Sequence, residues 1–213
     1  MKLICVVLSM ILLLSVMAGC RREPQNTTGS QSTISTPGAD TQPDDTQPDD
    51  TQPDAGETSG SVGVLASVWD LFGDDEKFAT YGGSVNHPVD NMPGKLSVQE
   101  TDELVSQYLI PQNQIGNIAE GASLVHMMNS NIFTAAVLQL TEGTDVETFA
   151  KAWHEVIRQN RWICGQPDAL LMLEVDGFVV MAFGSTDAMS LFEAKAGTAF
   201  PNAKTLYDEP IVG

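Results

Sequence analysis

The dipeptide Asp176-Gly177 lies between two apolar runs, residues 169–175 and 178–183. Both residues tolerate a positive φ, which a tight two-residue turn between antiparallel strands requires. The dipeptide therefore predicts a β-hairpin. A chain that forms this hairpin must cover its apolar strands with further elements, so this feature restricts the possible folds more than any other in the chain.

A second hairpin is expected upstream. Residues 123–128 and 132–140 are rich in β-forming side chains, and they flank the polar triplet Asn129-Ser130-Asn131. Short β-rich runs on either side of such a triplet are typical of antiparallel strands joined by a turn.

Each predicted hairpin is followed by a predicted helix. Thr144 and Glu147 form a capping-box pattern, in which the two side chains satisfy the free amides at a helix start. Apolar residues at helical spacing follow as far as Ile157. Thr186 is expected to cap the second helix and Gly197 to end it.

The first part of the domain is less regular. We expect a helix over residues 62–72, a short strand over 78–81, a loop over 84–94 and a helix from Thr101 towards Pro111. A last strand is expected near 204–207. The fold class that follows is α+β: an antiparallel sheet built from two consecutive ββα units with helices over one face, preceded by one or two short helices.

The N-terminus predicts export and lipidation. An apolar run from Leu3 to Val16 is too short for a membrane span, and it ends in Ala18-Gly19-Cys20. This pattern resembles a bacterial lipoprotein lipobox, which implies a signal peptide over residues 1–19 and a lipid, including palmitate, on Cys20. An anchor of two or three acyl chains is stable. The alternative is an ordinary signal peptide that contains a cysteine.

Residues 20–60 predict a disordered spacer after the lipidated cysteine. They are Ser, Thr, Gln, Asp, Pro and Gly-rich, and the sequence Thr-Gln-Pro-Asp-Asp occurs at 41–45 and again at 46–50. Such a segment has too little apolar surface to fold, and as a flexible coil it would span roughly 35 Å. Residues 61–213 are then left as a single α+β domain.

The charge distribution argues against nucleic-acid binding. The net charge is −18, and residues 61–213 hold 20 of the 28 acidic and 7 of the 10 basic residues. A field of this sign repels phosphate backbones and anionic head groups.

Cys5 is removed with the signal and Cys20 carries lipid, so Cys164 remains alone, and we expect it to be buried and unreactive.

With its lipobox, low-complexity spacer and final ββαββα order, the chain resembles small bacterial lipoproteins of the domain-of-unknown-function 4358 type. The resemblance covers roughly residues 62–197. It implies no established chemistry and no catalytic residues.

No catalytic motif, metal site or cofactor-binding motif is predicted. His154-Glu155 lacks the second histidine of a zinc protease, because Arg158 stands there. His126 is expected to be a hydrogen-bonded strand residue. The candidate interaction patch consists of Arg161 and Trp162, which follow a predicted helix, and of His87 in the long loop.

The expected function is that of a non-enzymatic, extracytoplasmic binding or interaction domain on a membrane-anchored lipoprotein, with an envelope protein or wall component as its partner. One alternative is a small solute-binding lipoprotein of a transporter, although one unit of about 150 residues is small for two closing lobes. The other alternative is an envelope hydrolase with a scattered site such as His87, Glu120 and Asp168.

Overall fold

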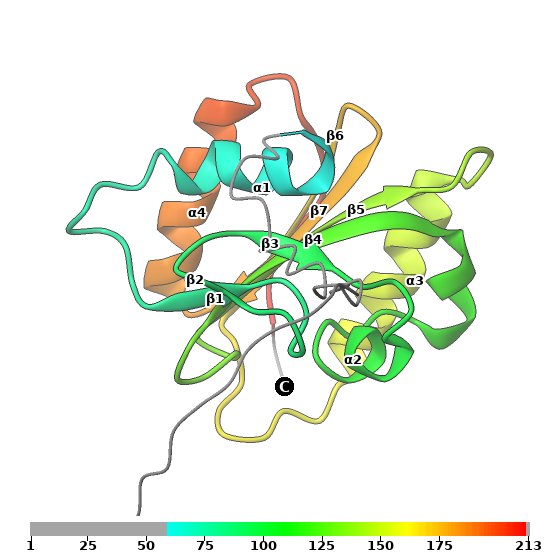
Figure 1. Cartoon of the computed structure of the whole chain (residues 1–213), viewed down its shortest axis with the longest axis horizontal. Coiled ribbons are helices and arrows are strands. Elements are labelled where there is room, and N and C mark those ends of the chain that lie inside the picture. Colours follow the sequence, from blue (N-terminus) through cyan, green and yellow to red (C-terminus); the bar gives the residue numbers. More distant parts are fainter. Residues whose placement is uncertain (1–58, 212–213) are drawn as a thin grey trace, which may run out of the picture. The chain divides into compact units, whose positions relative to one another are not determined.

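The computed structural model describes residues 59–211. These residues form an eight-stranded antiparallel sheet in the order β2-β1-β4-β5-β7-β6-β8, with β3 also paired to β4 (Figure 1). The strands are β1 (Thr80–Gly82), β2 (Val89–Asp90), β3 (Gly94–Leu96), β4 (Ile118–His126), β5 (Phe133–Leu140), β6 (Ala169–Val175), β7 (Phe178–Gly184) and β8 (Lys204–Pro210). The helices are α1 (Gly60–Trp69), α2 (Thr101–Ser106), the 3-10 helix η1 (Gln112–Asn117), α3 (Val146–Gln159) and α4 (Thr186–Ala199).

The α+β class and both ββα units are confirmed. β6 and β7 meet with Val175 opposite Phe178, and the two turn residues between them have φ values of 48° at Asp176 and 88° at Gly177. These positive values are what the tight turn requires. The second hairpin, β4–β5, is also present, although β4 begins five residues before the predicted start at Ser123.

The helices cover both faces of the sheet, which corrects the expectation of a single covered face. One cluster of buried residues joins the central strands to α2 and α3, and the other joins them to α1 and α4. Figure 1 shows these two pairs of helices on opposite sides of the sheet. On β5, for example, Ala136 and Leu138 belong to the first cluster, whereas Ala135 and Val137 belong to the second. The sequence agrees with this: β6 is apolar from Ala169 to Leu173 and β7 from Phe178 to Phe183, as in strands covered on both faces, instead of alternating.

The caps of α3 and α4 both differ from the predicted ones. Asp145, and not Thr144, caps α3 by accepting a hydrogen bond from the Thr148 amide (2.8 Å). Glu147 instead pairs with Lys204 on β8 (2.6 Å). The capping-box prediction was therefore wrong.

At α4 the N-cap residue is Ser185, whose side chain makes no capping bond. Asp168 supplies the cap from the loop before β6, since its Oδ2 accepts from the Thr186 amide (2.8 Å) and hydroxyl (3.0 Å). The helix also continues past Gly197 to Ala199, so the predicted end was wrong.

The segment 84–94, expected to be loop, contains β2 and the first residue of β3. Glycine makes this possible, because a Cβ on Gly82 would collide with the backbone at Met92 and Gly94. Because Gly82 and Gly94 both lack a side chain, β1 and β3 can lie close together along the same side of β4.

Residues 1–58 lie outside the described part of the chain, and so do the predicted signal peptide, Cys20 and nearly all of the spacer. Among residues 59–211, no helix is both long and apolar enough to cross a membrane.

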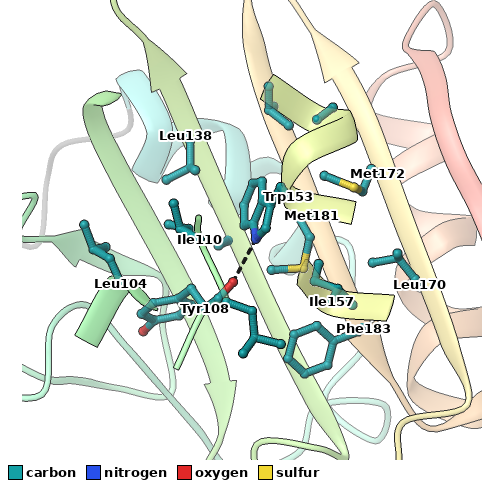
Figure 2. Close-up of a cluster of buried hydrophobic side chains, with 14 of the residues drawn as sticks. Leu104, Tyr108, Ile110, Leu138, Trp153, Ile157, Leu170, Met172, Met181 and Phe183 are labelled. Carbon is teal, nitrogen blue, oxygen red and sulfur yellow. Dashed lines mark hydrogen bonds between the residues drawn. The ribbon is translucent and has the colours of Figure 1, made fainter. Parts of the chain in front are cut away.

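A chain of buried hydrogen bonds joins the elements on the α2–α3 face. The Trp153 indole on α3 donates to the Tyr108 carbonyl (2.8 Å), in the segment that follows α2 (Figure 2). The Tyr108 hydroxyl contacts the Ser123 hydroxyl on β4 (3.0 Å), which contacts the backbone of Gly83. Trp153 and Tyr108 are both fully buried.

Removing the indole donor should destabilise the protein strongly. We expect Trp153→Phe to lower the free energy of unfolding by about 2–4 kcal/mol, because it leaves a cavity and a buried carbonyl without a donor. Urea unfolding followed by circular dichroism measures this.

Trp162→Phe is the matched control. Trp162 is only partly buried, and its indole makes no hydrogen bond to residues 59–211. This variant should lose less than about 1 kcal/mol. Equal losses in the two variants would contradict the role assigned to the Trp153 bond.

Candidate functional site

Four large apolar side chains are exposed on two neighbouring loops, and we call them the loop platform. Met127, Met128 and Ile132 lie on or beside the β4–β5 loop, and Ile163 lies on the loop between α3 and β6. Met128 is 84% exposed and Ile163 80%. Single exposed apolar residues are common, but a group of them on adjoining loops is typical of an interaction surface.

Asparagine side chains hold the two loops together. Asn131 Nδ2 donates to the carbonyls of Ile163 and Gly165 (both 2.6 Å), and Asn129 Nδ2 donates to the Cys164 carbonyl (3.3 Å). The two loops lie together at the lower edge of the view in Figure 1. These hydrogen bonds therefore fix the two loops, and with them the exposed apolar side chains, relative to each other.

His126 organises the β4–β5 loop from its own side. Its Nδ1 accepts hydrogen bonds from the amides of Met128 (3.2 Å) and Asn129 (3.3 Å). The prediction that this histidine is a hydrogen-bonded strand residue is confirmed, and the groups that it binds belong to the loop with the exposed methionines.

Cys164 lies on the same surface, which corrects the expectation of a buried cysteine. It is exposed and unpaired, and its φ of 65° places it in a tight turn with Gly165. Two of the three residues of the predicted patch lie next to it. Arg161 is exposed, and Trp162 is partly buried with its ring against Phe183 on β7 (5.1 Å between centroids).

His87 is not part of this surface, so the predicted three-residue patch does not form. It is exposed on the loop between β1 and β2 and lines a separate cavity of about 550 Å³ with Ser84, Lys95 and Glu120. Arg161 and Trp162 line a smaller cavity of about 230 Å³ between the end of α2 and the platform loops.

The scattered hydrolase site is not assembled either. Glu120 shares the cavity with His87, but its Oε1 accepts from the Ser61 amide (2.7 Å) at the start of α1. Asp168 caps α4, as described above. Both carboxylates thus hold helix N-termini, where negative charge is favourable.

The third histidine, His154, lies on α3. His154 stacks on Tyr207 of β8 and contacts Glu209 (2.9 Å), so it belongs to the contact between α3 and β8. In the stretch from residue 59 to 211, no group of three or more His, Cys, Asp or Glu side chains is placed to hold a metal ion.

A pair of carboxylates at the start of α2 was missed at the sequence level. Glu100 and Glu103 line a cavity of about 470 Å³ together with Asn86. Burial, and then the neighbouring Glu100 carboxylate, raise the pKa of Glu103 to about 7. The hydrogen bond from Asn86 keeps the pKa of Glu100 low. Their i, i+3 spacing at a helix start is a signal that could have identified the pair.

The chemistry available to this pair is the exchange of one proton near neutral pH. Glu103 Oε1 accepts from the Val85 amide (3.1 Å), so the carboxyl is held against the β1–β2 loop. Burial, and then the charge on Glu103, also raise the pKa of Tyr81.

The Glu103 pKa predicts that stability falls as pH rises. Between the unfolded value of 4.5 and the folded value of about 7, the folded protein binds more protons than the unfolded chain, so stability is lost over this range. Because the group is partly solvent-screened, we expect a loss of about 1–2 kcal/mol. Glu103→Gln should lack this component when unfolding is measured at about pH 5 and about pH 8.

Asp102→Asn provides the control for this measurement. Asp102 is exposed on the same turn of α2, and its replacement should leave the pH dependence of the wild type unchanged. Parallel pH profiles for the wild type and Glu103→Gln would contradict the assignment to Glu103.

No protein-family model, no curated protein and no solved structure matches this chain.

Proposed function

We propose that the chain is a lipid-anchored bacterial lipoprotein, attached to the cell membrane through Cys20, whose extracytoplasmic domain is a non-enzymatic interaction module. The domain binds an envelope protein partner through the loop platform. The observation that carries this proposal is the exposure of Met128 and Ile163 on two loops joined by Asn131. The resemblance to lipoproteins of the domain-of-unknown-function 4358 type agrees with the proposal and stays a prediction.

The energetics favour binding at this place. Full burial of a side chain such as Met or Ile stabilises a complex by about 1.5–3 kcal/mol. The asparagine bonds hold the loops before a partner arrives, so less conformational freedom is lost when it binds. Both features suit a central contact of a protein–protein interface.

The platform is also well placed for a partner. The start of α1 lies beside Glu120, near the start of β4, because the Ser61 amide donates a hydrogen bond to Glu120. The platform follows the end of the same strand, roughly 23 Å away at the usual strand rise. The anchor and spacer therefore join the domain far from the platform.

The two alternatives have weaker support. A hydrolase needs free catalytic groups, but Glu120 and Asp168 are engaged in holding helices. A solute-binding lipoprotein needs a site that encloses its ligand, and the cavities described above lie open on one domain.

The anchor is tested at its attachment residue. Cys20→Ala should abolish incorporation of a labelled palmitate analogue in cells, because the thioether-forming sulfur is gone. Cys164→Ala is the matched control and should incorporate the label as the wild type does. Label on Cys20→Ala at the wild-type level would refute lipidation at this residue.

The platform is tested by site-specific photo-cross-linking in intact cells. A photoreactive residue at position 128 or 163 should yield an adduct with the same partner, identified by mass spectrometry. The same residue at position 193, which is exposed on α4, should not yield it.

A second substitution makes this test specific. With the photoreactive residue at 128, Ile163→Asp should weaken the adduct more than about tenfold, because it places a charge in the apolar contact. If all three positions gave the same adducts, or none did, the platform would not be the binding surface.

A further inference from the structure

A groove lies directly beside the loop platform, and we call it the Arg161 groove. It is the cavity of about 230 Å³ described above, and its lining includes Arg161, Trp162, Ile163, Asn131 and Gln107. Ile163 belongs to both the groove and the platform. This volume is below that of sites for drug-sized ligands, so it suits one or two groups of a larger partner.

Of residues 59–211, Arg161 is the only charged one that lines this groove. No carboxylate of residues 59–211 pairs with it, although residues 61–213 have a net charge of −13. Arg158, one turn earlier, is paired with Glu209 (3.3 Å). An arginine left without a carboxylate in so acidic a domain provides a local positive site for an incoming anion.

The other groups of the groove suit an apolar residue that carries such an anion. Trp162, Leu109, Phe183 and Ile163 supply apolar surface. Gln107 also lines the groove, and its side-chain nitrogen is buried with no hydrogen-bond partner among residues 59–211.

We propose that the Arg161 groove binds a carboxylate that lies next to an apolar side chain of a peptide segment, with Arg161 as the residue that holds the carboxylate. The inference rests on the proposed function, since it specifies the chemistry of the partner that contacts the platform. A chain-terminal carboxylate and an acidic side chain share this chemistry, and the experiment separates them.

The test uses small probes on the full chain in detergent. N-acetyl-leucine carries a terminal carboxylate, the amide-capped dipeptide N-acetyl-Leu-Asp-amide carries a side-chain carboxylate, and N-acetyl-leucinamide carries none. Binding is followed by the NMR shift of the Trp162 indole N–H, assigned with Trp162→Phe. At least one carboxylate probe should bind, and N-acetyl-leucinamide should bind about tenfold more weakly. The probe that binds identifies the source of the carboxylate.

Arg161→Gln should weaken binding of that probe about tenfold, while Arg158→Gln, whose arginine is paired with Glu209, should leave it unchanged. No shift with either carboxylate probe at tens of millimolar, or equal binding of the amide, would overturn the inference. Binding of the protein to phosphatidylglycerol vesicles is measured as well. If that binding depended on Arg161, the surface would be assigned to lipid, and the peptide assignment would be overturned.

A failure of the carboxylate probes can be distinguished from a failure of the proposed interaction surface. The cross-linking at positions 128 and 163 does not involve Arg161 directly. If that adduct persists while the probes fail, the platform stands and only the chemistry of the groove is wrong.

Discussion

The hydrogen bond from the Trp153 indole to the Tyr108 carbonyl is the contact on which the α2–α3 face depends. It joins the middle of α3 to the segment after α2, and the Tyr108 hydroxyl continues the connection through Ser123 to Gly83. Four segments far apart in the sequence thus meet at a few buried polar atoms. Inside an apolar cluster each such bond is unfavourable to break, because the atom left behind cannot reach water.

This contact also explains a strained residue beside it. Leu109 has a φ of 56°, a conformation that non-glycine residues seldom adopt. The turn is closed by a hydrogen bond from the Ile110 amide to the Leu104 carbonyl (3.0 Å). Burial of Leu109 against the sheet and the anchoring of Tyr108 offset the strain, and they bring Leu109 and Gln107 to the edge of the Arg161 groove. The groove is therefore a consequence of how the α2–α3 face packs.

Much of the fold could be predicted from local patterns. The Asp176-Gly177 turn was predicted correctly because its two positive φ values depend on those two residues alone. The caps were not, because Asp168 reaches α4 from another loop and Glu147 is drawn to Lys204. The covering of both faces could have been predicted from the apolar runs 169–173 and 178–183, which do not alternate with polar residues.

The candidate site shows the same division. Arg161 and Trp162 were expected to form a patch because they follow one helix, and they do line one groove. The sequence could not show whether His87 lies beside Arg161 and Trp162, because its position depends on how the β1–β2 loop packs against α2. The exposed methionines were missed because Met127 and Met128 read as the continuation of a strand, and only the turn that His126 stabilises directs them outwards.

The sequence by itself determined the two hairpins, the amphipathic α3 and the acidic character of the domain, because each depends on residues that are neighbours along the chain. The tertiary structure decided which helices cover which face, that Asp168 caps α4, and that the pKa of Glu103 is raised to about 7. It also decided that the loops after β4 and α3 lie together. The physical reason is that burial and hydrogen bonding between distant segments exist only once the sheet has brought those segments together.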